Sequence, residues 1–270
     1  TNSKVNSEES PVESVISEIR AGAMWITLNR PDALNAITPA VVSGINAALD
    51  KAQLSDIHAV VLTGTGRAFC AGADLKFIRG EAGNDETSLS RFLDTVLLVM
   101  NRLETFPMPV IASLNGLTLA GGLELMLCCD LVVAARSAKL GAGHGNFGLL
   151  PGGGSSVRLP RKIGPTRAKY LLYTGEFVPA EQLVAAGLVN EVVDDDMLIP
   201  ATEALVAKLV NKSPLVLRRM KVLVDDGLEQ PCAIALRQEL LASEVHARSN
   251  DLKEGLAAFE EKRKPRFTGK

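Results

Sequence analysis

The sequence predicts an α/β core followed by a mainly α-helical C-terminal region, and three observations lead to this fold class. Short apolar runs rich in β-branched residues alternate with segments of helical periodicity as far as Pro151. After Pro151 the strand-like runs cease, and helical patterns follow one another towards the end of the chain. The 270 residues are 47% hydrophobic, which is enough to bury one large core.

The first half of the chain predicts strands and helices in alternation. Residues 14–28 are typical of two strands that meet at a turn at Ala21-Gly22. A helix is expected to begin at Pro39, because Thr38 suits the N-cap and proline suits the first helical position. Further strands are expected over 59–63, 110–114 and 131–135, and further helices over 88–103 and 120–129.

The second half predicts helices, and the change in pattern suggests how the chain is organised. Helices are expected over 157–164, 167–172, 179–185, 197–210, 213–226 and 234–264. We therefore expect a flexible N-terminal segment over 1–13, the core over 14–200 and a helical region over 201–270.

Composition and charge narrow the function classes. The net charge of -2 offers no basic excess for a nucleic acid. No apolar stretch reaches about 18 residues, so no membrane span is expected, and the polar first residues do not predict a secretory signal. The four cysteines, Cys70, Cys128, Cys129 and Cys232, lack metal-ligand spacing and favour free thiols in a reducing cytoplasm, without a metal site.

Gly121-Gly122 is the glycine pair that indicates chemistry. It follows the strand at 110–114 and opens the next helix, where the first N–H groups have no acceptor within the helix and favour a nearby negative charge. The absence of a Cβ lets a ligand approach, so the Gly121 N–H is expected to donate to an oxyanion. The N–H of Ala71, in another loop that follows a strand, is the expected second donor.

Several ordered motifs together resemble the enoyl-CoA hydratase/isomerase (crotonase) family. The resemblance covers about 14–267, nearly the whole chain. The motifs that carry it lie at 66–76, 109–116, 120–125, 151–154, 158–164, 172–176, 185–190 and 254–259.

The resemblance implies a ββα spiral core with a C-terminal trimerisation region, and a homotrimer or dimer of trimers. It implies an acyl-CoA thioester substrate, with coenzyme A as part of the substrate and no separate cofactor. It implies that the thioester oxygen binds the N–H groups of Ala71 and Gly121, each worth about 3–4 kcal/mol of barrier. The coenzyme A contacts that it implies are Ala73 and Lys76, with Phe259 and Lys262 reaching a neighbouring subunit.

The acid/base pair is where the chain departs from the family pattern. The resemblance implies two glutamates, and Glu124 matches the first. The second belongs to a Pro-Glu pair twenty residues further on, where this chain has Gly143-His144. Histidine titrates near neutral pH and suits general-base catalysis, so we expect His144 to act as the base and Glu124 as the acid.

Four functions stay open at this point. Water addition to an enoyl-CoA by Glu124 and His144 is the first. The second is hydrolysis of a C–C bond in a β-diketone or β-keto-acyl-CoA with His144 as base, although the aspartate that diketone hydrolases of this family carry in the matching segment is Gly153 here. The third is isomerisation of an enoyl-CoA. The fourth is a non-catalytic acyl-CoA-binding or assembly subunit. The acyl pocket is expected over 77–98, in a loop whose sequence does not reveal the acyl group.

Overall fold

A six-stranded sheet forms the centre of the protein, which is described here by a computed structural model of residues 13–80 and 86–270. Its strand order is β1-β2-β3-β5-β7-β10. These strands are β1 (Val15–Arg20), β2 (Ala23–Leu28), β3 (Ala59–Gly64), β5 (Val110–Leu114), β7 (Leu131–Ala135) and β10 (Glu191–Val193). Only β1 and β2 pair antiparallel, while the other neighbours pair parallel, as expected for an α/β core.

A second sheet of four very short strands, which the sequence did not predict, brings the loops of the site together. It runs β4 (Ala68–Cys70), β6 (Leu117–Leu119), β8 (Lys139–Gly141) and β9 (Val178–Pro179) in that order. Because β4 and β6 pair in parallel, the residues that follow them emerge at the same edge. Strands this short carry too few residues to show the period-2 alternation that sequence analysis relies on.

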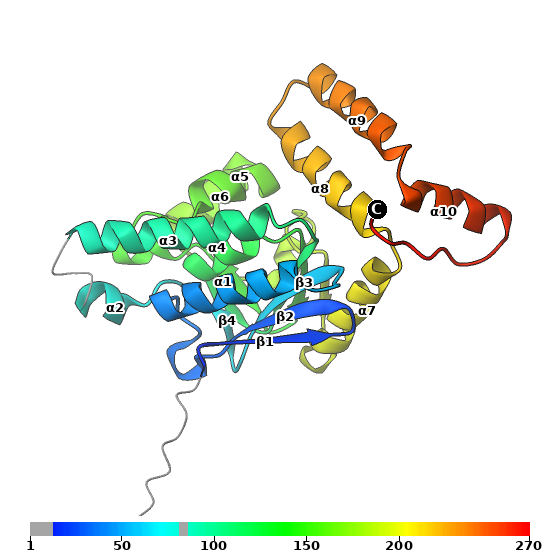
Figure 1. Ribbon diagram of the computed structural model, residues 1–270. Helices are drawn as coiled ribbons and strands as arrows, with labels where there is room; N and C mark the ends of the chain where they lie inside the picture. The colour runs from blue at the N-terminus through cyan, green and yellow to red at the C-terminus, as the bar shows by residue number, and fades with distance from the viewer. Residues whose placement is uncertain (1–12, 81–85) are drawn as a thin grey trace, which may run out of the picture.

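Helices α1 (Pro39–Gln53) and α3 (Glu86–Glu104) pack together over the sheets, with α2 (Leu75–Gly80) at one end (Figure 1). The start of α1 is as predicted, since the Thr38 side chain accepts a hydrogen bond from the Val41 N–H at 3.4 Å. The described part of the region 77–98, where a loop was expected before the helix predicted over 88–103, lies in α2 and α3. These two helices form one wall of the site described below.

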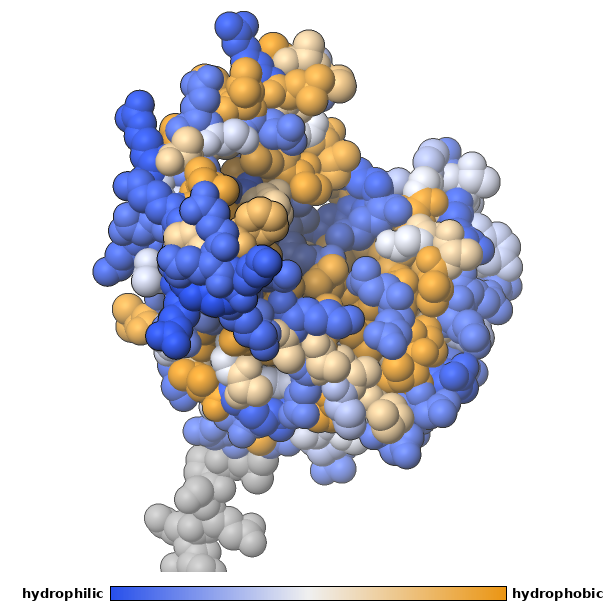
Figure 2. Space-filling view, turned by 90° about the vertical axis from the view of Figure 1, so that its right-hand side faces the viewer, coloured by the Kyte–Doolittle hydropathy of each residue, from blue (hydrophilic) through white to orange (hydrophobic). Residues whose placement is uncertain are grey.

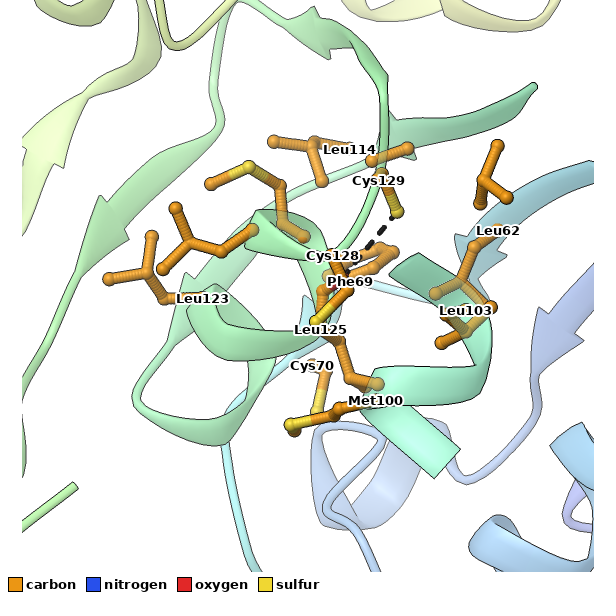
Figure 3. Packing of buried hydrophobic residues seen from close by; sticks show 14 of the residues in the cluster. Leu62, Phe69, Cys70, Met100, Leu103, Leu114, Leu123, Leu125, Cys128 and Cys129 are labelled. Carbon is orange, nitrogen blue, oxygen red and sulfur yellow. Dashed lines mark hydrogen bonds between the residues drawn. The ribbon is translucent and has the colours of Figure 1, made fainter. Parts of the chain in front are cut away.

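Helix α4 (Gly121–Leu127) lies at the heart of the hydrophobic core, and all of its residues are buried. Figure 3 shows Phe69 and Cys70 from β4 and Met100 and Leu103 from α3 gathered around it. Burial raises the pKa of the Cys70 thiol to about 12, so this cysteine is an inert packing residue. The helix therefore holds its residues in fixed positions.

The chain after Pro151 is mainly helical, as predicted, but it also contributes the strands β9 and β10, which the sequence did not predict. Its helices are α5 (Ser155–Ile163), α6 (Pro165–Thr174), α7 (Leu198–Val210), α8 (Pro214–Leu228), α9 (Cys232–His246) and α10 (Asn250–Glu260). Two of the expected helices differ as well. The helix expected over 179–185 is only a 3-10 turn, Ala180–Leu183. The single helix expected over 234–264 is wrong, because the chain turns after α9 and the Ser249 hydroxyl caps a new helix by accepting from the Leu252 N–H.

Helix α7 packs on the sheet, where Val206 joins a buried cluster with Trp25 and Val61. The boundary expected between 200 and 201 thus falls within a core helix. Helices α8, α9 and α10 project from the core as an arm (Figure 1). Apolar side chains gather on this arm near the top of Figure 2. Across the described ranges, no helix is long and apolar enough to cross a membrane.

Candidate active site

A cavity of about 200 Å³ lies where the N-terminus of α4 meets α2, α3 and the turn after β8. Its lining contains Glu124, His144 and the backbone at Ala73 and Gly121, together with apolar side chains. Larger surface hollows of about 490 Å³ beside α6 and about 450 Å³ between α8 and α9 lack this combination of groups. The smaller cavity is therefore the candidate active site.

Glu124 projects from the first turn of α4 and is only 3% exposed. Its Oε1 accepts a hydrogen bond from the Ser155 N–H at 2.9 Å, at the N-terminus of α5. A helix N-terminus favours a negative group, so this contact both satisfies and aims the carboxylate. Its other oxygen, Oε2, accepts no hydrogen bond from the residues that the structure describes and lies on the side of His144.

His144 begins a 3-10 turn, His144–Phe147, directly after Gly143, whose φ of 62° places the backbone in the left-handed region. The His144 Nε2 atom lies 3.8 Å from Glu124 Oε2, too far for a direct hydrogen bond. Its Nδ1 atom is buried and has no partner within the described ranges. The structure thus brings the two predicted acid/base residues face to face in the cavity.

The backbone donors differ from the prediction in one residue. The Ala71 N–H, expected at the oxyanion, donates to the Leu34 carbonyl at 3.0 Å and is already used. The N–H groups of Ala73 and Gly121 have no acceptor among the residues that the structure covers. These two amides are neighbours, since a Cβ built on Gly121 would lie 3.3 Å from the Ala73 nitrogen. Ala73 therefore replaces Ala71 as the available donor, because the Leu34 contact turns the Ala71 amide elsewhere.

The turn into α4 is held in an unusual conformation. Ala120 has φ 48° and ψ −116°, a region that costs a non-glycine residue of order 1–3 kcal/mol. A Cβ on Gly122 would lie 2.0 Å from the Cys70 carbonyl oxygen, so glycine is required there for α4 to meet the β4 chain. This close contact fixes the N–H of Gly121 beside Ala73.

Gly153 faces Glu124 directly. A Cβ on this glycine would lie 2.6 Å from Glu124 Oε2 and 2.5 Å from Met100 Sδ. No side chain fits there unless Glu124 moves. The Glu124 carboxylate thus fills the space into which an aspartate at 153 would extend.

Arg158, which the sequence analysis did not single out, secures this turn from behind. Its Nη1 donates to the Gly153 carbonyl at 2.7 Å, and its Nε and Nη2 donate to Glu104. Burial lowers the pKa of the guanidinium, but the hydrogen bonds to Glu104 outweigh burial and leave it raised. No pattern in the sequence indicates this role of Arg158, because it depends on how residues 151–158 fold.

The residues expected to bind coenzyme A are only partly brought to the site. Ala73 lines the cavity. Lys76 is exposed at the start of α2, two residues after Asp74. Phe259, 84% exposed on α10, and Lys262, just beyond α10, do not line the cavity. No group of three or more His, Cys, Asp or Glu side chains that could hold a metal ion occurs in the part of the chain described.

Comparison with known proteins shows to which family the chain belongs. The family model for enoyl-CoA hydratase/isomerase matches residues 18–270. Crotonyl-CoA hydratase of Syntrophomonas wolfei is 33% identical, covering 96% of this chain and 99% of that protein. The 2,3-dehydroadipyl-CoA hydratase of Escherichia coli is 36% identical, covering 92% of this chain and 95% of its own length.

The solved structures agree. The crystal structure of an enoyl-CoA hydratase from Bacillus anthracis superposes with a TM-score of 0.91 at 34% identity, covering 95% of this chain and 100% of that one. The predicted ββα core with a helical C-terminal region is confirmed by this match. The chain therefore belongs to the enoyl-CoA hydratase/isomerase family.

Proposed function

We propose that the protein adds water across the double bond of an enoyl-CoA thioester. The observation that carries this proposal is that Glu124 Oε2 and His144 Nε2 lie 3.8 Å apart in one cavity, beside two backbone N–H groups that have no acceptor among the described residues. Relatives named as hydratases of crotonyl-CoA and 2,3-dehydroadipyl-CoA support the reaction class.

The reaction follows from this geometry. The N–H groups of Ala73 and Gly121 donate to the thioester oxygen and stabilise the negative charge that develops there. Water forms a bond from its oxygen to C3, and the electrons of the C2–C3 double bond move towards the thioester oxygen. One member of the Glu124–His144 pair accepts a proton from the water. The other delivers a proton to C2 as the thioester carbonyl re-forms, so the product is the 3-hydroxyacyl thioester.

The pair carries one proton in either assignment of acid and base. His144 as base requires a protonated Glu124, and Glu124 as base requires a protonated His144. The two states differ only in where that proton sits, so a pH profile reports on the pair and not on one residue.

The proposal is tested by measuring the hydration of crotonyl-CoA, which is followed as the loss of the enoyl thioester absorbance. Glu124→Gln and His144→Ala should each lower kcat by about 10²–10⁴-fold, the usual contribution of a positioned acid or base. His58→Ala is the matched control, because His58 lies in the segment before β3 and not in the cavity lining. Full activity in His144→Ala would contradict the assignment, and a folded wild-type protein that hydrates no enoyl-CoA would refute the function.

One observation favours a second reaction, hydrolysis of a C–C bond in a β-diketone or β-keto-acyl-CoA. The Glu124 carboxylate occupies the space next to Gly153 and lies 3.8 Å from His144 Nε2, so its negative charge can stabilise the imidazolium that forms when His144 activates water. Attack on the ketone would release an acid and leave an enolate for the Ala73 and Gly121 amides. Turnover of a β-diketone in the absence of activity on crotonyl-CoA would select this reaction.

We propose, further, that copies of this chain cover the arm in a homotrimer or dimer of trimers. Helices α8 and α9 contain no buried residue, and they expose large apolar side chains such as Leu228, Leu236 and Leu240. In such an assembly Phe259 and Lys262 would reach a neighbouring subunit's coenzyme A, and Lys76 would reach the coenzyme A of its own subunit.

Free cysteines support a reducing compartment such as the cytoplasm.

A further inference from the structure

We propose that the acyl pocket accepts uncharged, apolar enoyl groups and rejects acyl chains that carry a second carboxylate. This inference rests on the proposed function, because it assigns the substrate class of the same cavity. It separates two kinds of substrate that the named relatives divide between them, crotonyl-CoA and 2,3-dehydroadipyl-CoA.

The wall of the cavity is almost entirely apolar. Glu124 and His144 are the only side chains with a polar group in the described lining. The α3 wall presents Leu89, Phe92, Leu93 and Val96, which share one helical face. Beneath them the Phe77 ring packs edge-on against Phe92, with centroids 5.1 Å apart. A terminal carboxylate would meet hydrocarbon on this side of the pocket.

The arginine behind the cavity is already paired with other groups. Arg158 lies behind the Gly153 turn, and its donors already bind the Gly153 carbonyl, Asn101 and Glu104. It is absent from the cavity lining. The described lining contains no lysine or arginine side chain that could pair with a second carboxylate.

The physical consequence is a large penalty for a charged acyl end. An ionised carboxylate loses its hydration on entering an apolar cavity, and an unpaired buried charge is strongly disfavoured. When Glu124 is ionised, repulsion adds to this cost. The loss in kcat/KM for a carboxylated substrate should therefore be at least about 100-fold.

A pair of substrates of matched shape measures this selectivity. The carboxylated compound is trans-2,3-dehydroadipyl-CoA, and its apolar counterpart is trans-6-methylhept-2-enoyl-CoA, in which two methyl groups replace the carboxylate oxygens. The proposal predicts a kcat/KM at least about 100-fold higher for the apolar compound. Values within tenfold of each other would overturn it.

Binding of the saturated thioesters separates this inference from the proposed function. Adipyl-CoA and 6-methylheptanoyl-CoA cannot be hydrated, so calorimetric Kd values report on the pocket alone. Weak binding of adipyl-CoA beside tight binding of its apolar counterpart supports the inference even if no enoyl-CoA is hydrated. Equal binding overturns it even if crotonyl-CoA is hydrated.

A reversal variant tests the electrostatic cause. Leu75 lines the pocket and is 47% exposed, so an arginine there keeps contact with solvent and leaves the fold intact. Leu75→Arg should narrow the preference for 6-methylheptanoyl-CoA over adipyl-CoA by about tenfold or more, whereas Leu75→Gln, the uncharged control, should not. If both variants narrowed this preference equally, the lack of a positive charge could not be the reason that the pocket rejects a carboxylate.

Discussion

Helix α4 is enclosed by the rest of the chain, whereas helices α8 and α9 lie at its surface. Every residue of α4 is buried, and the helix meets β4 so closely that Gly122 has no room for a side chain. Helices α8 and α9 have no buried residue in the chain alone, and pack mainly against one another. The proposed acid/base pair is thus held by a core that the single chain completes, whereas the arm exposes apolar surface.

The largest expected effect comes from a side chain at Gly153, which would break the geometry of the core. Gly153→Asp should displace Glu124, because the new Cβ falls 2.6 Å from Oε2, and should lower kcat for crotonyl-CoA by about 10²–10⁴-fold. Gly227→Ala in α8 is the control, since its nearest contact is an ordinary 3.6 Å. Retained activity in Gly153→Asp would show that the position of Glu124 is not critical.

The next effect concerns Arg158 as a positioning residue. Arg158→Met removes the donor to the Gly153 carbonyl and should lower kcat by about tenfold or more, because a small misplacement of a catalytic group is costly. It should also move the pH profile of kcat, since a purely structural defect lowers activity without moving it. Partial recovery in Arg158→Lys would support the positioning role, whereas an unchanged pH profile in Arg158→Met would contradict it.

A change on the arm should alter assembly and leave the fold of the chain intact. Leu236 and Leu240, 60% and 61% exposed, lie four residues apart on one face of α9. Replacing both with glutamate should reduce the molar mass measured by light scattering, with unchanged helix content by circular dichroism. Arg237→Glu adds negative charge on another face and serves as the control. An unchanged mass in the double variant would rule out this face as the subunit contact.

The smallest effect is on stability. Asp251 accepts hydrogen bonds from Ser213, Thr268 and Gly269 and so ties the arm to the C-terminus. Burial raises its pKa, but these bonds outweigh burial and lower it below the ordinary 3.8. Its stabilisation is therefore present above pH 3.8 and is lost as the pH falls through the lowered value.

Asp251→Asn should lower the free energy of unfolding by about 2 kcal/mol at neutral pH, measured by urea denaturation. The difference between the variant and the wild type should shrink in acid, as the wild-type carboxylate is protonated. A difference that stays constant from pH 7 to acid would contradict a role for the charge.

The sequence predicted the long elements well and the short ones poorly. The strands at 110–114 and 131–135 agree with β5 and β7, because continuous apolar runs bounded by turn residues give a clear signal. Strands β4, β6, β8 and β9 went unpredicted, since their pairing depends on contacts between distant segments.

The same limit applies to the site. Glu124, His144 and Gly121 were identified from motif and spacing, and the structure brings all three to one cavity. Ala71 and Ala73 both follow β4 in a run of small residues, so the sequence offers no means of telling them apart, and Ala71 was predicted. Only the Leu34 carbonyl, which binds the Ala71 N–H, distinguishes the two.

The most direct test of the proposed hydration is the fate of solvent atoms. Crotonyl-CoA incubated with the protein in deuterated water enriched in oxygen-18 should yield 3-hydroxybutyryl-CoA with the heavy oxygen at C3 and deuterium at C2. His144→Ala should form this product far more slowly than His58→Ala. A folded wild-type protein that binds butyryl-CoA but forms no labelled hydroxyacyl thioester would contradict the account.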